Sequence, residues 1–372
     1  MTIKNANVFR ADGRFEHGDI AIVGEHFADA SHDGDVLDAG GCYAIPGLID
    51  IHLHGCVGYD FADANEAGLQ EMSRFLASNG VTAVCPAMIT LPEAKLVAAC
   101  KQVAAHVRTG GAEFIGIHLE GPFLAPNKCG AQNPAYLQLP DVSLVRRMQA
   151  LTGGMVKLLA IAPELEGAME LIGQLSEEIT CSLAHTEADY LTARAAFAQG
   201  ARQATHLYNG MLPFGHRAPG LIGAAMDEPN CRVELICDNV HIHPSVVRAT
   251  MRMFGDERVI FISDSMMAAG LEDGIYELGG LAVEVKDKRA HLVNSDTIAG
   301  SVCSLMDCVR TAVQEVGIPL GSAVKCASVN PAKAIAVFDQ RGSIELGKYA
   351  DLVLLNKDLS IRTVFLRGKR VE

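Results

Sequence analysis

Two histidines, separated by one residue, end an apolar run near the start of the chain. The run IPGLIDIHLHG, residues 45–55, carries His52 and His54 among its last residues. Side chains alternate between the two faces of a β-strand, so these imidazoles are expected to project from the same side. Two imidazoles side by side at the end of a buried strand provide half of a divalent-metal site. Two packed core histidines would give the same pattern, and the interpretation therefore depends on the rest of the chain.

Later apolar runs end in further groups that can bind metal ions or transfer protons. In chain order, these groups are His118, Glu120, His185, His206, Asp238, His241 and Asp264. Imidazole nitrogen and carboxylate oxygen are common ligands of divalent metals. Glu120, His185 and His206 supply three ligands for one ion, each from a different run.

A second ion can be held by His52, His54 and Asp264, with Glu120 as the bridge. No thiolate lies among these groups, so zinc, the metal we expect, and also iron, manganese and cobalt fit the ligand set. The sequence thus predicts a divalent-metal cofactor, with one or two ions per chain. A metal held by three protein groups keeps a position for water, whose pKa can fall to about 7. Asp264 is then the candidate that takes a proton from this water and delivers it to a leaving group; a buried carboxylate that only orients a loop is the alternative.

These groups must be positioned by a repeated unit, in which an apolar run ends in polar residues and a helix-like segment follows. The runs span residues 49–54, 81–90, 114–120, 156–163, 180–185, 203–209, 232–241 and 259–264, and helices are predicted at 66–79, 92–107, 142–151, 166–178, 187–199 and 244–254. Eight buried strands separated by helices predict an α/β fold, a parallel (β/α)₈ barrel of the TIM type. Catalytic groups of such barrels lie where strands end and βα loops begin, which accounts for the positions of the ionisable groups. An open, doubly wound sheet is the alternative, but no Gly-rich phosphate-binding motif follows the first strand.

Both ends of the chain are predicted to be β-rich. Short strands separated by turns are expected at residues 3–9, 19–23 and 36–37, and again at 342–345, 350–355 and 363–367. We expect the two ends to pair into one small β-sandwich domain, residues 1–45 and 336–372, outside a catalytic barrel of residues 46–335. After the last barrel strand, residues 270–297 predict one or two hairpins, and Ser301 is expected to cap the apolar helix that follows.

Composition excludes several classes of protein. The 372-residue chain has a formal net charge of −13 and no run rich in lysine and arginine, which argues against a nucleic-acid partner. No apolar run approaches the roughly 20 residues that cross a bilayer, so no membrane association is expected. The 11 cysteines are scattered and never arranged as CxxC, which is typical of reduced thiols. Because the first residues, MTIKNANVFR, also lack the pattern of a signal peptide, we expect a cytoplasmic protein.

Several motifs resemble those of the amidohydrolase superfamily. The HLH motif after PGLID, and the tail GKYADLVLL at residues 347–355, occur across that superfamily. The set HLEGPF (118–123), AHT (184–186), THLYN (205–209) and SD (263–264) is similar to the N-acetylglucosamine-6-phosphate deacetylases within it. HLEGPF and THLYN are specific to this subfamily. The resemblance runs in order over nearly the whole chain.

The resemblance implies a (β/α)₈ barrel with a small β-sandwich from both chain ends, in a protein that is usually a homodimer. It assigns Glu120, His185 and His206 to a main metal ion, His52 and His54 to a second ion, and Asp264 to acid/base catalysis. The implied substrate-binding residues are Ala131, Gln132, Asn209, Gly210, Arg217, His241, Ile298, Ala299 and Gly300. Of these, Arg217 is expected to reach the phosphate of the ligand in the neighbouring subunit, where a guanidinium fork pairs two phosphate oxygens.

The implied activity removes the acetyl group from N-acetylglucosamine-6-phosphate, giving glucosamine-6-phosphate and acetate in amino-sugar catabolism. One position departs from the family, because Gln132 stands where a histidine is usual. A glutamine can donate an N–H to a carbonyl oxygen but carries no positive charge. Deacetylation of N-acetylgalactosamine-6-phosphate or another N-acyl amino sugar is therefore the second hypothesis. A non-catalytic sugar-phosphate sensor is the third, and the presence of the metal-binding groups and Asp264 argues against it.

Overall fold

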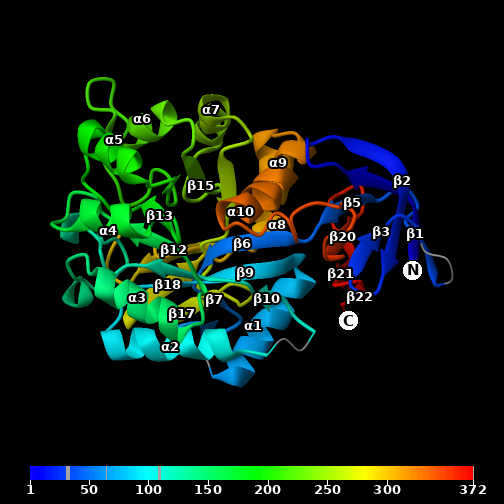
Figure 1. The fold of residues 1–372 in the computed structure, drawn as a ribbon, viewed down its shortest axis with the longest axis horizontal. Helices are drawn as coiled ribbons and strands as arrows, with labels where there is room; N and C mark the ends of the chain where they lie inside the picture. The colour runs from blue at the N-terminus through cyan, green and yellow to red at the C-terminus, as the bar shows by residue number, and fades with distance from the viewer. Residues whose placement is uncertain (31–33, 64, 108–109, 372) are drawn as a thin grey trace.

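The fold consists of a parallel barrel and a separate sheet that contains strands from both ends of the chain (Figure 1). The computed structural model describes residues 1–30, 34–63, 65–107 and 110–371. The predicted fold class is confirmed. In Figure 1 the barrel lies to the left, and both termini lie with the small sheet to the right.

Eight parallel strands form the barrel, and each pairs with the next one along the chain. They are β6 (Leu48–Leu53), β9 (Val81–Met88), β11 (Ile117–Glu120), β12 (Val156–Ile161), β13 (Thr180–Leu183), β14 (Gln203–Ala204), β15 (Arg232–Ile236) and β16 (Val259–Ile262), with the short β10 (Glu113–Phe114) beside β9. Their residues are almost all buried, because one face lines the barrel interior and the other packs against helices. Between β16 and β6, the backbone N–H of Asp264 donates to the carbonyl of His52 at 2.9 Å.

Helices cover the outside of the barrel. They are α1 (Glu66–Ser78), α2 (Glu93–Ala105), α3 (Val142–Leu151), α4 (Ala168–Leu175), α5 (Tyr190–Gln199), α6 (Gly220–Asp227), α7 (Pro244–Phe254), α8 (Leu305–Thr311), α9 (Leu320–Ala327) and α10 (Val329–Ala334). Helix α6 is not among the predicted helices, because it is short and contains two glycines, which disfavour helix formation. Burial of Leu221 and Ile222 stabilises it in the folded chain.

The small sheet joins the two ends of the chain. Strands β1 (Thr2–Phe9), β2 (Phe15–Val23), β3 (His26–Ala28), β4 (Val36–Asp38) and β5 (Tyr43–Pro46) come from one end, and β20 (Leu352–Leu355), β21 (Ile361–Leu366) and β22 (Lys369–Arg370) from the other. Strand β5 pairs with β1 and with β20, and buried side chains such as Ile3, Phe27 and Leu352 form a separate core. The predicted strand at 342–345 is wrong: Lys348 binds the Ser343 hydroxyl and the Glu345 carboxylate there and stabilises a turn.

Two further antiparallel sheets follow barrel strands. One pairs β7 (Gly55–Cys56) with β8 (Tyr59–Asp60) after β6, and the other consists of β17 (Gly274–Leu278), β18 (Leu281–Lys286) and β19 (Arg289–Leu292), as the hairpin prediction for residues 270–297 required. The predicted cap of the next helix is wrong. Ser304 caps α8 in a capping box with Asp307. Ser301 instead donates its hydroxyl to the Ser263 carbonyl at 2.5 Å and its N–H to the Asp264 carbonyl at 2.7 Å, so it holds the end of β16.

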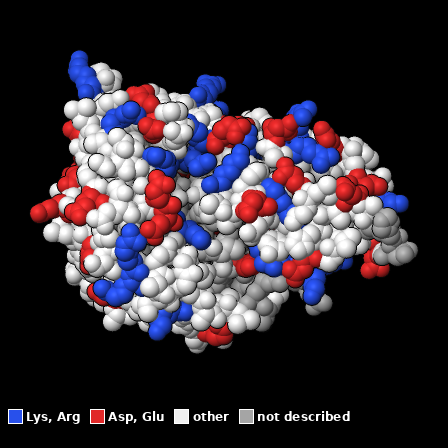
Figure 2. Space-filling model, in the orientation of Figure 1, with Lys and Arg blue, Asp and Glu red and all other residues white. Residues whose placement is uncertain are grey.

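The surface carries charges of both signs. On the face seen in Figure 2, Lys and Arg side chains are interspersed with Asp and Glu side chains over both the barrel and the small sheet. A basic stripe of the kind that binds nucleic acid is not seen on that face, in agreement with the acidic composition. Within the described ranges, no helix combines the length and hydropathy that crossing a membrane requires.

A charged cluster connects the small sheet to the barrel. Glu113, in β10, accepts hydrogen bonds at 2.8 Å from Arg367, which follows β21, and also pairs with Arg341. The Arg341 side chain is 4% exposed and pairs with Asp351 as well. The ring of Tyr349 lies beneath both guanidinium groups, 3.9 Å from that of Arg367 and 4.8 Å from that of Arg341. Glu113 is therefore the barrel residue that neutralises two arginines of the other part.

This arrangement makes a prediction about stability. Glu113→Gln should lower the free energy of unfolding by about 1.5–3 kcal/mol, the usual contribution of hydrogen bonds to charged groups. The matched control is Glu16→Gln, whose carboxylate pairs with Arg10 at the surface, where both side chains are more than 40% exposed. The control should change stability by less than about 1 kcal/mol. Equal urea-unfolding curves for the two variants would show that the cluster does not stabilise the fold.

Candidate metal centre and active site

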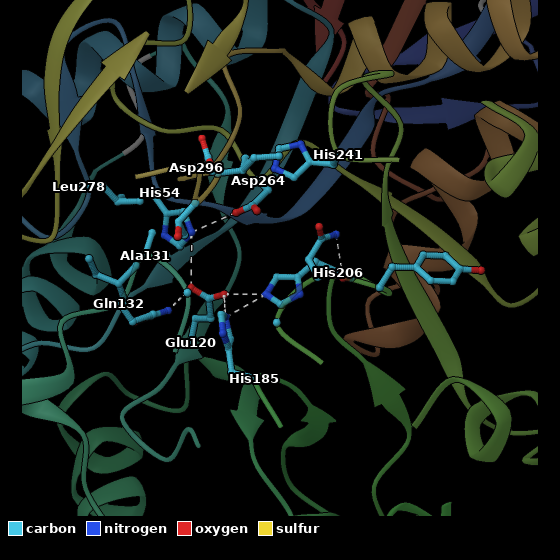
Figure 3. Close-up of a pocket in the computed structure, with 18 residues that line it drawn as sticks. His54, Glu120, Ala131, Gln132, His185, His206, His241, Asp264, Leu278 and Asp296 are labelled. Carbon is cyan, nitrogen blue, oxygen red and sulfur yellow. Dashed lines mark hydrogen bonds and ion pairs between the residues drawn. The ribbon is translucent and has the colours of Figure 1, made fainter. Parts of the chain in front are cut away.

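Six of the predicted groups converge at the carboxyl ends of the barrel strands. Five of them lie at the base of one cavity (Figure 3), and the sixth, His52, is buried beside them. His52 lies within β6 and His54 directly after it, and Glu120 is the last residue of β11. His185, His206 and Asp264 each lie two residues after β13, β14 and β16. Because parallel strands of a barrel end at the same rim, residues far apart in the sequence meet there.

Glu120, His185 and His206 form the tightest group. The Oε1 atom of Glu120 lies 3.1 Å from the Nε2 atom of each histidine, and the two Nε2 atoms lie 3.0 Å apart. The three side chains are between 3% and 8% exposed. One carboxylate oxygen and two imidazole nitrogens thus point at one spot, with the donor types and spacing that a divalent ion needs.

A second group lies around the same carboxylate. His52 Nε2 is 3.4 Å from Glu120 Oε1, and His54 Nε2 is 3.5 Å from Glu120 Oε2. Asp264 Oδ1 is 3.1 Å from His54 Nε2 and 3.5 Å from His52 Nε2. His52, His54 and Glu120 can also hold an ion, so Glu120 belongs to both groups.

Hydrogen bonds from the outer ring nitrogens orient the imidazoles. His185 Nδ1 lies 2.7 Å from the Lys128 carbonyl, and His54 Nδ1 lies 3.2 Å from the Ala87 carbonyl. A carbonyl only accepts, so each Nδ1 carries the proton and each Nε2 offers its lone pair to the centre of the site. Both rings are therefore prepared to bind a cation.

The charges of the site require a positive partner. Burial raises the pKa of Glu120, but His52, His185 and His206 outweigh this effect and hold the pKa well below its usual range. Burial also raises the pKa of Asp264, yet His52 and His54 lower it to about 2. Burial lowers the pKa of His52, whereas three carboxylates, Glu120 first among them, raise it well above its usual value. The carboxylates are thus ionised and draw positive charge into the site.

One atom tests directly whether these residues fit a metal ion. His52 Nε2 is fully buried and has no hydrogen-bond partner among the described residues, although Glu120 and Asp264 lie within 3.5 Å. An unpaired buried nitrogen of this kind destabilises the folded state. A divalent cation at this place would bind that lone pair and neutralise both carboxylates. The donor set therefore fits the metal that the sequence predicts.

Three of these residues have backbone conformations that are rare for side chains other than glycine. The φ angles are +44° at His185, +28° at His206 and +50° at Asp264. Such conformations destabilise a chain by about 1–3 kcal/mol each and concentrate at functional sites. Here each one turns the chain two residues after a strand, and its side chain points into the site (Figure 3).

A cavity of about 360 Å³ opens above these groups. Predicted substrate-binding residues line it, namely Ala131, Gln132, Asn209, Gly210, His241, Ile298 and Gly300. Ala299 is fully buried behind this wall, and Arg217 lies exposed on the loop before α6, outside the lining. His118, by contrast, lies below the site: its Nδ1 faces the Ile51 carbonyl at 3.2 Å, and burial lowers its pKa to about 4, so it is neutral.

Gln132 contacts a predicted metal ligand. Its Nε2 donates to Glu120 Oε2 at 2.6 Å, and its Oε1 accepts from the Thr90 backbone N–H at 2.6 Å. An amide nitrogen carries two hydrogens, so one remains for a ligand in the cavity. Gln132 therefore holds Glu120 in place and can still donate toward the cavity.

Part of the cavity wall and one buried supporting residue are not identified by any motif in the sequence. The cavity is also lined by Ile89, Leu278, Asp296 and Thr297. The last three belong to the segment around β17–β19, and no motif in the sequence predicts how this segment packs. Glu234, in β15, accepts from His52 Nδ1 at 2.9 Å. A carboxylate within the apolar run of residues 232–237 was the available signal for it.

Comparison with known proteins agrees with this geometry. Residues 43–371 match the model of the amidohydrolase family. The N-acetylglucosamine-6-phosphate deacetylase of Bacillus subtilis is 36% identical over 372 residues, which cover 98% of this chain and 92% of that protein. The N-acetylgalactosamine-6-phosphate deacetylase of Escherichia coli O157:H7 is 33% identical over 87% of this chain and 86% of its own length.

A solved structure agrees over the whole chain. It is an aspartate-to-alanine mutant of the N-acetyl-D-glucosamine-6-phosphate deacetylase from Mycobacterium smegmatis, in complex with N-acetyl-D-glucosamine-6-phosphate. It has a TM-score of 0.93 and 32% sequence identity, and the match covers 100% of this chain and 99% of that one. The chain therefore belongs to the amidohydrolase family and, within it, to the family of the N-acetylglucosamine-6-phosphate deacetylases.

Proposed function

We propose that this protein is a metal-dependent hydrolase that converts N-acetylglucosamine-6-phosphate into glucosamine-6-phosphate and acetate. The observation that carries this assignment is the convergence of Glu120, His185 and His206 within 3.1 Å at the base of the cavity, beside Asp264. Membership of the deacetylase family supports the same reaction. The reaction belongs to amino-sugar catabolism.

Two divalent ions, with zinc as the expected metal, are assigned to the two groups that share Glu120. Glu120, His185 and His206 would hold the first ion, and His52 and His54 the second, with Asp264 beside it. A bound divalent ion acts as a Lewis acid on the amide carbonyl and lowers the pKa of a water molecule. The lone pairs of His54 and His185 are already directed inward by their carbonyl partners, which supports this assignment.

Asp264 is assigned as the acid and base of the reaction. Its carboxylate is ionised and lines the cavity, so it can take a proton from the attacking water. The same oxygen then delivers this proton to the sugar nitrogen, which leaves as an amine. Ser301 holds the backbone of Asp264 from behind and restricts the direction of the carboxylate.

The sugar phosphate is assigned to the upper part of the cavity. Gln132, with Ala131 beside it, would direct its free N–H toward the acetyl carbonyl; Asn209 and Gly210 would bind the phosphate. His241 and the segment of Ile298, Ala299 and Gly300 would contact the sugar ring. Because the neutral Gln132 replaces the usual histidine and one relative is an N-acetylgalactosamine-6-phosphate deacetylase, that sugar is the second candidate substrate.

A homodimer is proposed because the cavity lacks a cation for the phosphate. None of its 18 lining residues, all within the described part of the chain, is lysine or arginine. Arg217 is exposed on a loop that also exposes Phe214, and we assign it to the phosphate bound by the neighbouring subunit. The guanidinium group would supply the bidentate pairing that the cavity itself does not offer.

Domain limits and cellular location complete the proposal. The small domain is assigned to residues 1–45 and 336–372 and the catalytic barrel to residues 46–335, close to where β5 and α10 end. All 11 cysteines have free thiols, which supports a cytoplasmic location, because that compartment keeps thiols reduced.

The activity is tested by acetate release from four sugars: the N-acetylated glucosamine and galactosamine, each with and without the 6-phosphate. N-acetylglucosamine-6-phosphate should give the highest kcat/KM. Removal of metal with a chelator should abolish turnover, and Zn²⁺ should restore it. A preference for the galactosamine epimer would move the assignment to the second candidate, and tight binding without acetate release would indicate a sensor.

Asp264→Asn tests the proton-transfer role. The amide keeps the size of the side chain but accepts no proton, so kcat should fall at least about 100-fold. Metal content, measured on the same sample, should be largely kept, because Glu120, His185 and His206 are unchanged. Near-normal turnover would transfer the role to another group, with His241 the next candidate.

Arg217→Ala tests the shared site. It should raise KM for the phosphorylated sugar far more than for the unphosphorylated one. Mixed dimers of Arg217→Ala chains and Asp264→Asn chains contain one complete site if the arginine acts across the interface, and they should regain activity above either parent. Activity no higher than that of the parents would show that Arg217 does not serve the neighbouring subunit.

A further inference from the structure

Glu234 is a buried carboxylate with no access to the cavity. It lies in the middle of β15, its relative exposure is 0%, and it is not among the residues that line the cavity. Taking an ionised carboxylate out of water destabilises the folded state unless strong hydrogen bonds compensate. The hydrogen bonds that compensate for the burial of Glu234 therefore indicate its role.

Three donors point at this carboxylate. Oε2 lies 2.9 Å from His52 Nδ1 and accepts from the backbone N–H of His206 at 3.2 Å. Oε1 accepts from Gln203 Nε2 at 2.6 Å. The donors come from β6, from β14 and from the residues just after β14, so this side chain joins β15 both to its neighbour β14 and to β6, which lies beyond β16.

The bond to His52 determines which ring nitrogen carries the proton. A carboxylate accepts, so Nδ1 carries the hydrogen and Nε2 keeps its lone pair. That Nε2 is the buried atom without a hydrogen-bond partner, 3.4 Å from Glu120 and 3.5 Å from Asp264. With the other tautomer, a hydrogen would occupy the place of the ion.

The bond to His206 acts on the other group of ligands. The backbone of His206 has a φ of +28°, which is unfavourable for a histidine, and its N–H is held by the same oxygen that orients His52. One atom, Glu234 Oε2, is thus bonded to a ligand of each proposed ion. It holds the side chain of one ligand and only the backbone of the other.

We propose that Glu234 is a positioning residue that sets the tautomer of His52 and thereby prepares the second ion site. The inference rests on the proposed function only in taking His52 as a metal ligand. Partners that orient a metal-binding histidine typically contribute about 10- to 100-fold to metal affinity. The effect is larger for the ion held by His52, because Glu234 contacts the side chain of His52 but only the backbone of His206.

Glu234→Gln tests this role. The shape is kept, and Gln203 can turn its amide toward the new NH₂ group because its own Oε1 has no partner among the described residues. The amide oxygen can still accept from His52 Nδ1, but the charge that makes this bond strong is removed. Co²⁺ titration of the metal-free protein, followed by visible absorption and by competition with a chelator, should show two ions in the wild type. In the variant, the weaker ion should bind about 10- to 100-fold less tightly, and the tighter ion should change less.

Asp351→Asn is the matched control. Asp351 is also a buried carboxylate held by hydrogen bonds, but it directly precedes β20, and its partners are Arg341 and the backbone N–H of Arg367. The control should lose thermal stability and keep both ion affinities. If ion affinity falls in both variants in proportion to the loss of stability, or stays at the wild-type level in Glu234→Gln, Glu234 has only a structural role and the inference is wrong.

Two further measurements separate this inference from the proposed function. His52→Ala should abolish the weaker ion; if it does not, His52 is no ligand and the two-ion assignment itself fails. If His52→Ala loses that ion but Glu234→Gln keeps it, only the role of Glu234 fails. More than two ions in the wild type would indicate a third ion among His52, His118 and Glu234. Glu234 would then bind that ion instead of accepting a hydrogen bond from His52, and the inference would be wrong. Should Glu234→Gln not fold, ¹⁵N spectra of the Zn²⁺-loaded wild-type protein report which His52 nitrogen binds the ion, and binding through Nδ1 would contradict the inference.

Discussion

The buried carboxylate of Glu120 is the constraint on which the site depends. It lies at the centre of the barrel rim, nearly out of water, and four imidazoles lie within 3.5 Å of its two oxygens. Burying an anion is unfavourable unless positive charge and hydrogen bonds compensate, and here they come from three strand ends, those of β6, β13 and β14, and from Gln132. The residues of the site therefore depend on one another, because the buried negative charge of Glu120 is stable only with the four imidazoles beside it.

The loop after β11 depends on the same carboxylate. Gln132 bonds Glu120 on one side and the Thr90 backbone on the other, and the Lys128 carbonyl orients His185. The Ala125 N–H returns a hydrogen bond to the His185 carbonyl at 2.9 Å. The loop that covers the site and the residues that form its base thus stabilise one another. A change in this loop is expected to affect metal binding as well as substrate binding.

The strand ends contribute backbone geometry as well as side chains. His185, His206 and Asp264 all turn through left-handed conformations, which the chain would avoid without support. Each of them is supported: Glu234 accepts from the N–H of His206, and the N–H groups of Ser301 and Ala125 donate to the carbonyls of Asp264 and His185. None of the three supporting residues lines the cavity. The strained backbone at the rim is therefore held by hydrogen bonds from residues outside the cavity.

The amino-acid sequence alone determined the barrel and most of its rim. Eight apolar runs of the right spacing predicted the strands, and the positions of His52, His54, Glu120, His185 and His206 at their ends predicted a metal centre. Both signals are local, because burial on two faces demands a continuous apolar run and catalysis requires polar residues where that run stops. The motifs around them supplied the family.

Only the tertiary structure decided how these groups are connected. Ser301 reads as a helix cap in the sequence but supports Asp264, because its hydroxyl meets the end of β16 only after the chain has passed through β17–β19. Gln132 reads as a substrate contact but also bonds Glu120, and Glu234 carries no motif at all. Such bonds join residues from 12 to 182 positions apart. Local pattern therefore predicts which residues reach the rim, whereas the closure of the barrel determines which of them share a proton, an oxygen or an ion.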